Sequence, residues 1–102
     1  MNTKNILILE NDKCIFYENS FTDIANKDLR SKGLKYKCFW VKLKNENTFN
    51  YVLVNPKGVV AYETGLYESL GTMIDMLAFD KEYSERWYKI FLNKNYQKSY
   101  WH

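Results

Sequence analysis

The segment KYKCFWVKLKNENTFNYVLVNPKGVVAYET, residues 35–64, is the clearest indication of the fold in this sequence. Three stretches within it, 35–44, 49–55 and 58–64, are rich in β-branched and aromatic residues, which favour strands. The stretches are separated by residues 45–48 and 55–58, whose Asn, Pro and Gly residues are typical of tight turns. The segment therefore predicts an antiparallel meander of three strands.

The residues before this segment predict a hairpin and a helix. Short apolar runs at 6–9 and 14–17 flank a polar turn, which is the pattern of a β-hairpin. Ser20 and Asp23 resemble a capping box, and the apolar residues that follow fall on one helical face. Gly33 can then end the helix in a left-handed conformation. We expect a helix over residues 20–31.

The residues after the meander predict two more helices. One apolar stripe at helical spacing begins at Leu66, and Asp80 can cap a last helix that contains Tyr83 and Ile90. The expected order is ββαβββαα, an α+β fold in which helices pack on one face of an antiparallel sheet made of the N-terminal hairpin and the three-strand meander. The residues expected in the core are Leu70, Ile74, Leu77, Trp87 and Phe91.

Composition favours one globular domain over residues 1–102, with an aromatic C-terminal tail at 96–102. Hydrophobic residues make up 46% of the chain and aromatic residues 18%, too much for a disordered protein. The longest apolar runs, such as residues 6–9, are far shorter than the roughly 20 residues that cross a bilayer. We expect a cytoplasmic protein without membrane contact. The net charge of +3 allows nucleic-acid binding but does not require it.

The chain offers little for catalysis. Its one histidine is the last residue, His102, and its carboxylates are scattered without metal-ligand spacing. Cys14 and Cys38 are not in a CxxC pair, and we expect both to be buried, reduced thiols. The sequence therefore predicts a protein that is not an enzyme and has no cofactor or metal site.

Four lysines in the first meander strand form one candidate site. A strict two-residue period places Lys35 and Lys37 on one face and Lys42 and Lys44 on the other. A β-bulge at Phe39-Trp40 would bring all four onto the solvent face, as a ladder that could contact phosphates. The alternative interpretation is an edge strand whose lysines prevent aggregation.

Aromatic residues form the candidate protein-binding sites. Trp40 or Phe39 could fill a pocket of a partner, as aromatic anchors do in protein interfaces. Tyr96, Tyr100 and Trp101 follow the last expected helix. These three residues either pack back onto the core or serve as exposed anchors.

The element order from Ser20 through the terminal helices resembles that of small phage anti-CRISPR inhibitors, which have a helix, a three-stranded antiparallel sheet and two helices. The resemblance covers about four fifths of the chain and lies in layout, without a shared motif. It implies an inhibitor that contacts protein or masks an RNA, because this chain lacks an acidic, DNA-like composition. Residues 20–79 also resemble double-stranded RNA-binding domains, but Gly65-Leu66-Tyr67-Glu68 replaces their basic cluster.

These features favour a small interaction protein, encoded by a phage or mobile element, that binds and modulates or inhibits a host protein or ribonucleoprotein. The alternative is a nucleic-acid-binding accessory or regulatory domain that uses the lysine ladder. A homodimer could form through the meander face away from the helices, where Val52, Val54 and Val60 lie.

Overall fold

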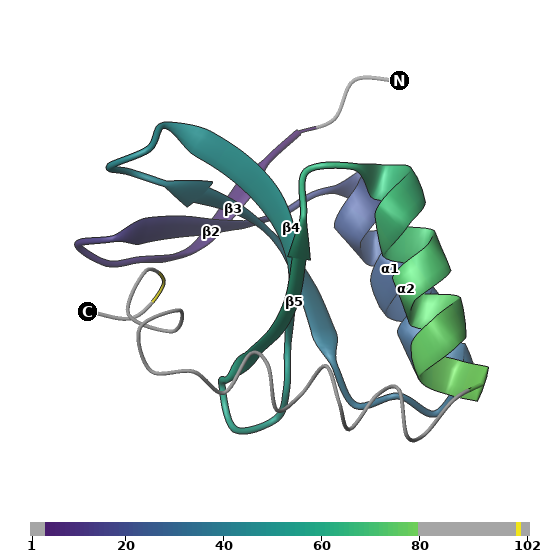
Figure 1. Cartoon of the computed structure of the whole chain (residues 1–102). Coiled ribbons are helices and arrows are strands. Elements are labelled where there is room, and N and C mark those ends of the chain that lie inside the picture. Colours follow the sequence, from purple (N-terminus) through teal and green to yellow (C-terminus); the bar gives the residue numbers. More distant parts are fainter. Residues whose placement is uncertain (1–3, 80–99, 101–102) are drawn as a thin grey trace.

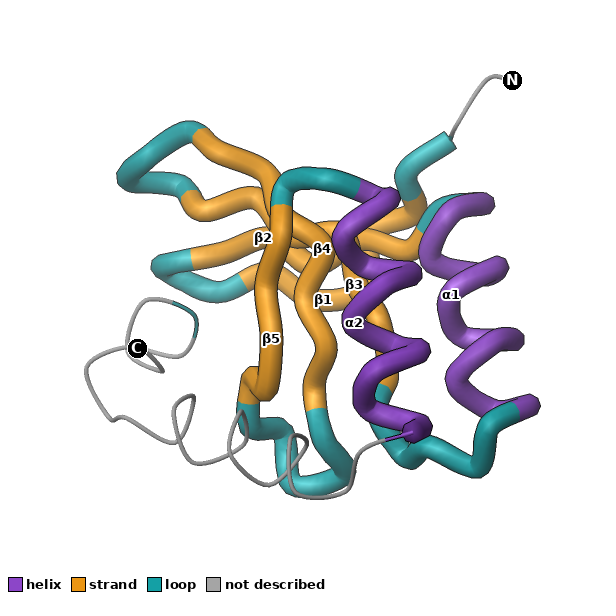
Figure 2. Tube along the Cα trace, turned by 45° about the vertical axis from the view of Figure 1, so that its right-hand side comes forward, coloured by secondary structure: helices purple, strands orange, loops and turns teal. Residues whose placement is uncertain are grey.

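The computed structural model describes residues 4–79 and Tyr100. It confirms the α+β fold: five antiparallel strands form one sheet in the order β1-β2-β3-β4-β5, and two helices cover one face of it (Figure 1, Figure 2). The elements are β1 (Ile6–Glu10), β2 (Cys14–Glu18), α1 (Ser20–Ser31), β3 (Lys37–Leu43), β4 (Thr48–Val54), β5 (Val60–Thr64) and α2 (Tyr67–Phe79). The helix expected after Asp80, with Trp87 and Phe91, lies outside the described residues.

The helix α1 spans the expected residues, but its cap is one residue earlier than expected. The Asn19 side chain accepts a hydrogen bond from the Thr22 backbone at 2.9 Å, and the Thr22 hydroxyl accepts one from the Asn19 backbone at 2.9 Å. This reciprocal pair satisfies two backbone donors of the first turn. The predicted Ser20–Asp23 capping box is therefore wrong, although the helix still begins at Ser20.

The expected bulge at Phe39-Trp40 is wrong. The ladder between β3 and β4 is unbroken from Lys37 opposite Val54 to Leu43 opposite Thr48. A bulge would be needed only if one face of this strand were buried and the other exposed. Side chains cover both faces instead, so simple alternation accounts for the whole strand. Register shifts occur in the β1–β2 and β4–β5 ladders.

The sheet has a core on each face. The helix side contains Cys38, Leu53 and the expected residues Leu70, Ile74 and Leu77, all buried, which confirms these three core predictions. The far side is a second cluster of buried residues: Cys14, Phe16, Val41, Leu43, Val52, Val54, Val60 and Tyr100. The three valines expected at a dimer face therefore lie inside a core, and this route to a homodimer is wrong.

Candidate functional site

Three aromatic residues, Tyr17, Trp40 and Phe49, meet on the helix side of the sheet. The β2–β3 register places Tyr17 opposite Trp40, and Trp40 stacks on Phe49 with ring centroids 5.4 Å apart and 14° between the ring planes. Trp40 also contacts buried Tyr51, its partner on β4, with 4.4 Å between centroids. Trp40 thus contacts two rings and is only partly buried. We call Tyr17, Trp40 and Phe49 the aromatic surface.

The aromatic surface lies beside the two helices. The helix α1 packs on β3 and α2 on β5, whereas the turns that join β1 to β2 and β3 to β4 extend away from both helices (Figure 1). Phe49, next to the second of these turns, is 39% exposed. On β1, Leu7 lies opposite Tyr17 and is exposed, which extends the apolar area to the sheet edge. Lys42 adds one cation, with its Nζ 5.8 Å from the Phe49 centroid.

The structure does not bring the four lysines together. Because β3 alternates regularly, Lys37 lies on the far face with Phe39, and Lys42 lies on the helix side with Trp40. Lys37 forms an ion pair with Glu18 at 3.0 Å, and Lys44 forms one with Glu10 at 2.6 Å. Lys35 is exposed and precedes the strand.

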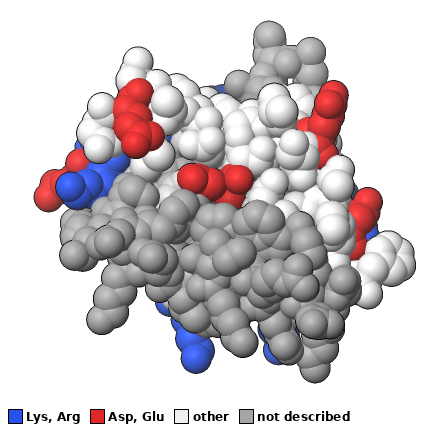
Figure 3. Space-filling model, viewed as in Figure 1, with Lys and Arg blue, Asp and Glu red and all other residues white. Residues whose placement is uncertain are grey.

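On the face shown in Figure 3, acidic side chains are scattered among uncharged residues. The described lysine and arginine side chains lie at the margins of this face. The described residues of this face thus form no continuous basic surface of the kind that tracks a phosphate backbone.

Phe39 and Tyr100 belong to the far face rather than to the aromatic surface. Phe39 is half-buried and meets Phe16 edge to face, with ring centroids 5.7 Å apart. Tyr100 is fully buried in the same cluster, and its carbonyl accepts a hydrogen bond from the Asn11 amide at 3.0 Å. Tyr100 therefore packs on the core, one of the two alternatives that the sequence left open. Tyr96 and Trp101 lie outside the described residues.

The sequence reading missed the exposure of β1. Its four consecutive apolar residues, Ile6, Leu7, Ile8 and Leu9, are 56%, 54%, 45% and 46% exposed. A continuous apolar run is typical of a strand buried on both faces, but β1 is the edge of the sheet and no described helix packs on it. Only the strand order, which sequence does not display, reveals this surface.

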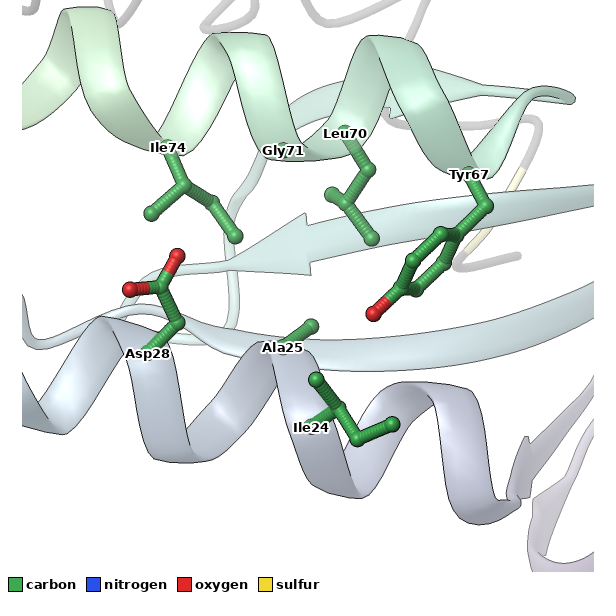
Figure 4. A pocket seen from close by; sticks show the side chains of 7 residues that line it. All are labelled: Ile24, Ala25, Asp28, Tyr67, Leu70, Gly71 and Ile74. Carbon is green, nitrogen blue, oxygen red and sulfur yellow. The ribbon is translucent and has the colours of Figure 1, made fainter.

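A groove of about 280 Å³ runs between α1 and α2 (Figure 4). Its floor and walls are apolar, and two polar groups, the Asp28 carboxylate and the Tyr67 hydroxyl, lie at its ends. Asp28 is already paired with Lys32, which also reaches Asp75 at 3.1 Å. The apolar periodicity of the two helical segments includes the buried residues that line the groove, Ala25 of α1 and Leu70 and Ile74 of α2. The same periodicity does not indicate a groove between the helices.

The two thiols are unsuited to nucleophilic chemistry. Burial raises the pKa of Cys38 to about 12. Burial also raises the pKa of Cys14 to about 11, against a smaller opposing effect of the nearby Lys44. Both cysteines are buried, as expected, and they lie in different core clusters. Neither forms an appreciable amount of thiolate at neutral pH.

Residues 4–79 and Tyr100 contain no group of three or more His, Cys, Asp or Glu side chains arranged to hold a metal ion. Neither described helix is both long and apolar enough to span a membrane.

No protein-family model, curated protein or solved structure is significantly similar to this chain. The aromatic surface and the exposed β1 strand are therefore interpreted from their own geometry.

Proposed function

We propose that this protein is a non-enzymatic binding module that attaches to a host protein through the aromatic surface. The observation that carries the proposal is the state of Trp40, a partly buried indole in contact with the rings of Phe49 and Tyr51. Trp and Tyr side chains supply most hot-spot energy in protein interfaces. A ring that is already held in place loses little conformational entropy on binding.

The neighbouring groups suit a protein partner. Leu7 and Phe49 add exposed apolar area, and Lys42 adds a single positive charge at the margin. An apolar, aromatic centre with polar groups around it is the usual composition of an interface core and rim. The high thiol pKa values and the ion pairs of Glu10, Glu18 and Asp28 favour binding over catalysis.

The partner class rests on the element order. The helix, three strands and helix that begin at Ser20 resemble small phage inhibitors of CRISPR systems, and this supports an inhibitor of a host protein or ribonucleoprotein, acting in the cytoplasm. Direct occupation of a protein surface is the mechanism that the aromatic surface favours.

The test is capture of the host partner with a tagged protein, followed by affinity measurement with the purified partner. Trp40→Ala and Phe49→Ala should each weaken binding at least tenfold, because they remove anchors of the interface. Phe79→Ala is the matched control, since Phe79 is an 87% exposed phenylalanine at the end of α2. Equal affinity of all variants would contradict the proposal.

Nucleic acid is the second candidate, favoured by the position of Lys42 beside two stackable rings. Trp40 and Phe49 could stack on bases of a single strand while Lys42 meets a phosphate. In that case the captured partner would be RNA or DNA, and its affinity would fall steeply with salt. Capture of a protein with an affinity that does not depend on salt concentration would favour the protein partner over the nucleic acid.

A further inference from the structure

The strand β1 has one sheet neighbour, β2, and its outer edge pairs with nothing in the described part of the chain. Its apolar side chains are about half-exposed along the whole run from Ile6 to Leu9. An edge of this kind carries unpaired backbone donors and acceptors and is a template for another strand. Neither Pro nor a charged residue interrupts this run, and its one irregularity is a register shift between Leu7 and Leu9.

The register shift in β1 determines which side chains share a face. Leu7 lies opposite Tyr17, on the helix side, and Leu9 lies opposite Phe16, on the far side. Ile6 lies opposite Glu18, which is also on the far side because Phe16 and Glu18 alternate with Tyr17. Ile6 and Leu9 therefore point to the same face, which a strand without the shift would not allow.

This arrangement makes β1 complementary to itself. Residues opposite each other in an antiparallel ladder must share a face, and Ile6 and Leu9 satisfy that condition. Pairing two copies about a twofold axis between Leu7 and Ile8 sets Ile6 opposite the second copy's Leu9. It also sets Leu7 opposite the second copy's Ile8. Every apolar residue of the run then faces another apolar residue.

The charges that flank the run also match. Continued beyond β1, this register brings Lys4 of one copy toward the second copy's Asn11 and Asp12, in the turn between β1 and β2. Lys44 already binds Glu10, whereas Asp12 is exposed and has no described ion pair. Antiparallel pairing thus brings Lys4 to Asp12 at both ends of the interface, while parallel pairing would place like charges together.

We infer that two copies of this chain associate through antiparallel pairing of their β1 strands. The product is one ten-stranded sheet with the helices of both copies on the same side, because the twofold axis is perpendicular to the sheet. Leu7 adjoins Tyr17, so the two aromatic surfaces also lie on that side, flanking the axis. The dimer can therefore bind a repeated or two-part target with both surfaces at once.

The test is the molecular mass in solution, measured by sedimentation over a range of concentrations. The wild-type protein should reach about twice the 12.3 kDa chain mass. The Ile8→Lys variant should sediment as a monomer, because it places two lysines beside the twofold axis without affecting a buried side chain. Ile24→Lys is the matched control: Ile24 is a 51% exposed isoleucine on α1, and this variant should stay dimeric.

A charge exchange tests the antiparallel register. Lys4→Glu and Asp12→Lys should each weaken the dimer, and the double variant should restore it, because the exchange recreates both ion pairs. Failure of the double variant to recover would overturn this register.

A wild-type protein that stays monomeric, or an Ile8→Lys variant that stays dimeric with a wild-type melting curve, would overturn the dimer. If the wild type is monomeric and Ile8→Lys loses the captured partner, the edge receives a strand of that partner instead. Trp40→Ala should remain dimeric, so failure of the dimer and failure of the proposed function give different results.

Discussion

Asn26 shows how one polar residue joins α1 to the sheet. Its amide donates to the Cys38 carbonyl at 3.2 Å and accepts from the Cys38 backbone N–H at 2.7 Å. The β2–β3 ladder ends at Trp40, because the chain turns into α1 after Glu18. Asn26 therefore takes the place of the missing strand and satisfies both backbone groups of a buried residue.

We predict that Asn26→Ala lowers the free energy of unfolding by about 1–3 kcal/mol, since it leaves buried backbone groups of Cys38 without a partner. Urea denaturation measures this change. Lys27→Ala, an exposed change on the same helix, should have little effect. A loss no larger than that of Lys27→Ala would show that water replaces the amide.

The Cys38 thiol should make stability depend on alkaline pH. Its pKa rises from an ordinary 9.0 to about 12 in the fold, so the unfolded chain loses this proton first as pH increases. Below pH 9 the protonated thiol does not reduce the free energy of unfolding. As pH rises from 9 toward 12, the free energy of unfolding falls, because the unfolded chain loses the thiol proton and the folded chain keeps it. Tyr51, whose pKa burial also raises, acts in the same direction.

Denaturation at pH 7.5 and 10.5 tests this prediction. Cys38→Ala should lose less stability between the two pH values than the wild type, because the variant lacks the thiol. Comparing each protein with itself removes the effect of the smaller side chain. Identical pH dependence of the two proteins would contradict the assigned role of Cys38.

At the scale of elements, α2 is attached to the sheet by a narrow apolar stripe. Leu70, Met73, Ile74 and Leu77 are buried, while Met76, at the side of this stripe, is 40% exposed. Ile74 also lines the groove against α1 (Figure 4). Gly71 lies within α2 and lowers its intrinsic helix propensity. The helix is therefore stabilised mainly by the packing of this stripe on the sheet.

We predict that Ile74→Ala lowers the free energy of unfolding by about 2–5 kcal/mol, because it removes a 1% exposed side chain and leaves a cavity. Met76→Ala should change it by less than about 0.5 kcal/mol, as exposed substitutions usually do. Thermal denaturation of the two variants gives the comparison. Equal melting temperatures would contradict the docking of α2 through this stripe.

At the scale of the whole molecule, the sheet is covered on both sides by different parts of the chain. The helices cover one face, and Tyr100, from the other end of the sequence, is buried against Phe16, Val41 and Val52 on the other. The Asn11 amide fixes the Tyr100 backbone at the β1–β2 turn. Tyr100 thus contributes to the stability of the N-terminal hairpin.

We predict that Tyr100→Ala lowers the free energy of unfolding by about 3 kcal/mol or more, in the range of other large aromatic residues removed from cores. Tyr100→Phe keeps the ring and should keep most of the stability. Hydrogen exchange should show faster opening of β2 in the alanine variant. Unchanged exchange in β2 would mean that Tyr100 does not support the far face.

The order of the described strands and helices, and three residues of the helix-side core, could be predicted from the sequence. Turn residues at 45–48 and 55–58 separate the strands, and the apolar period places Leu70, Ile74 and Leu77, because these signals are local. The tertiary structure alone decided which surfaces remain open. The exposure of β1 follows from its place at the edge of the sheet. The lysines are separated because both faces of β3 are covered and its side chains alternate regularly. The position of Tyr100 depends on contacts between segments that are distant in the sequence. Trp40 was found from its residue type, but its partners Phe49 and Tyr17 emerge only when strand register brings them beside it.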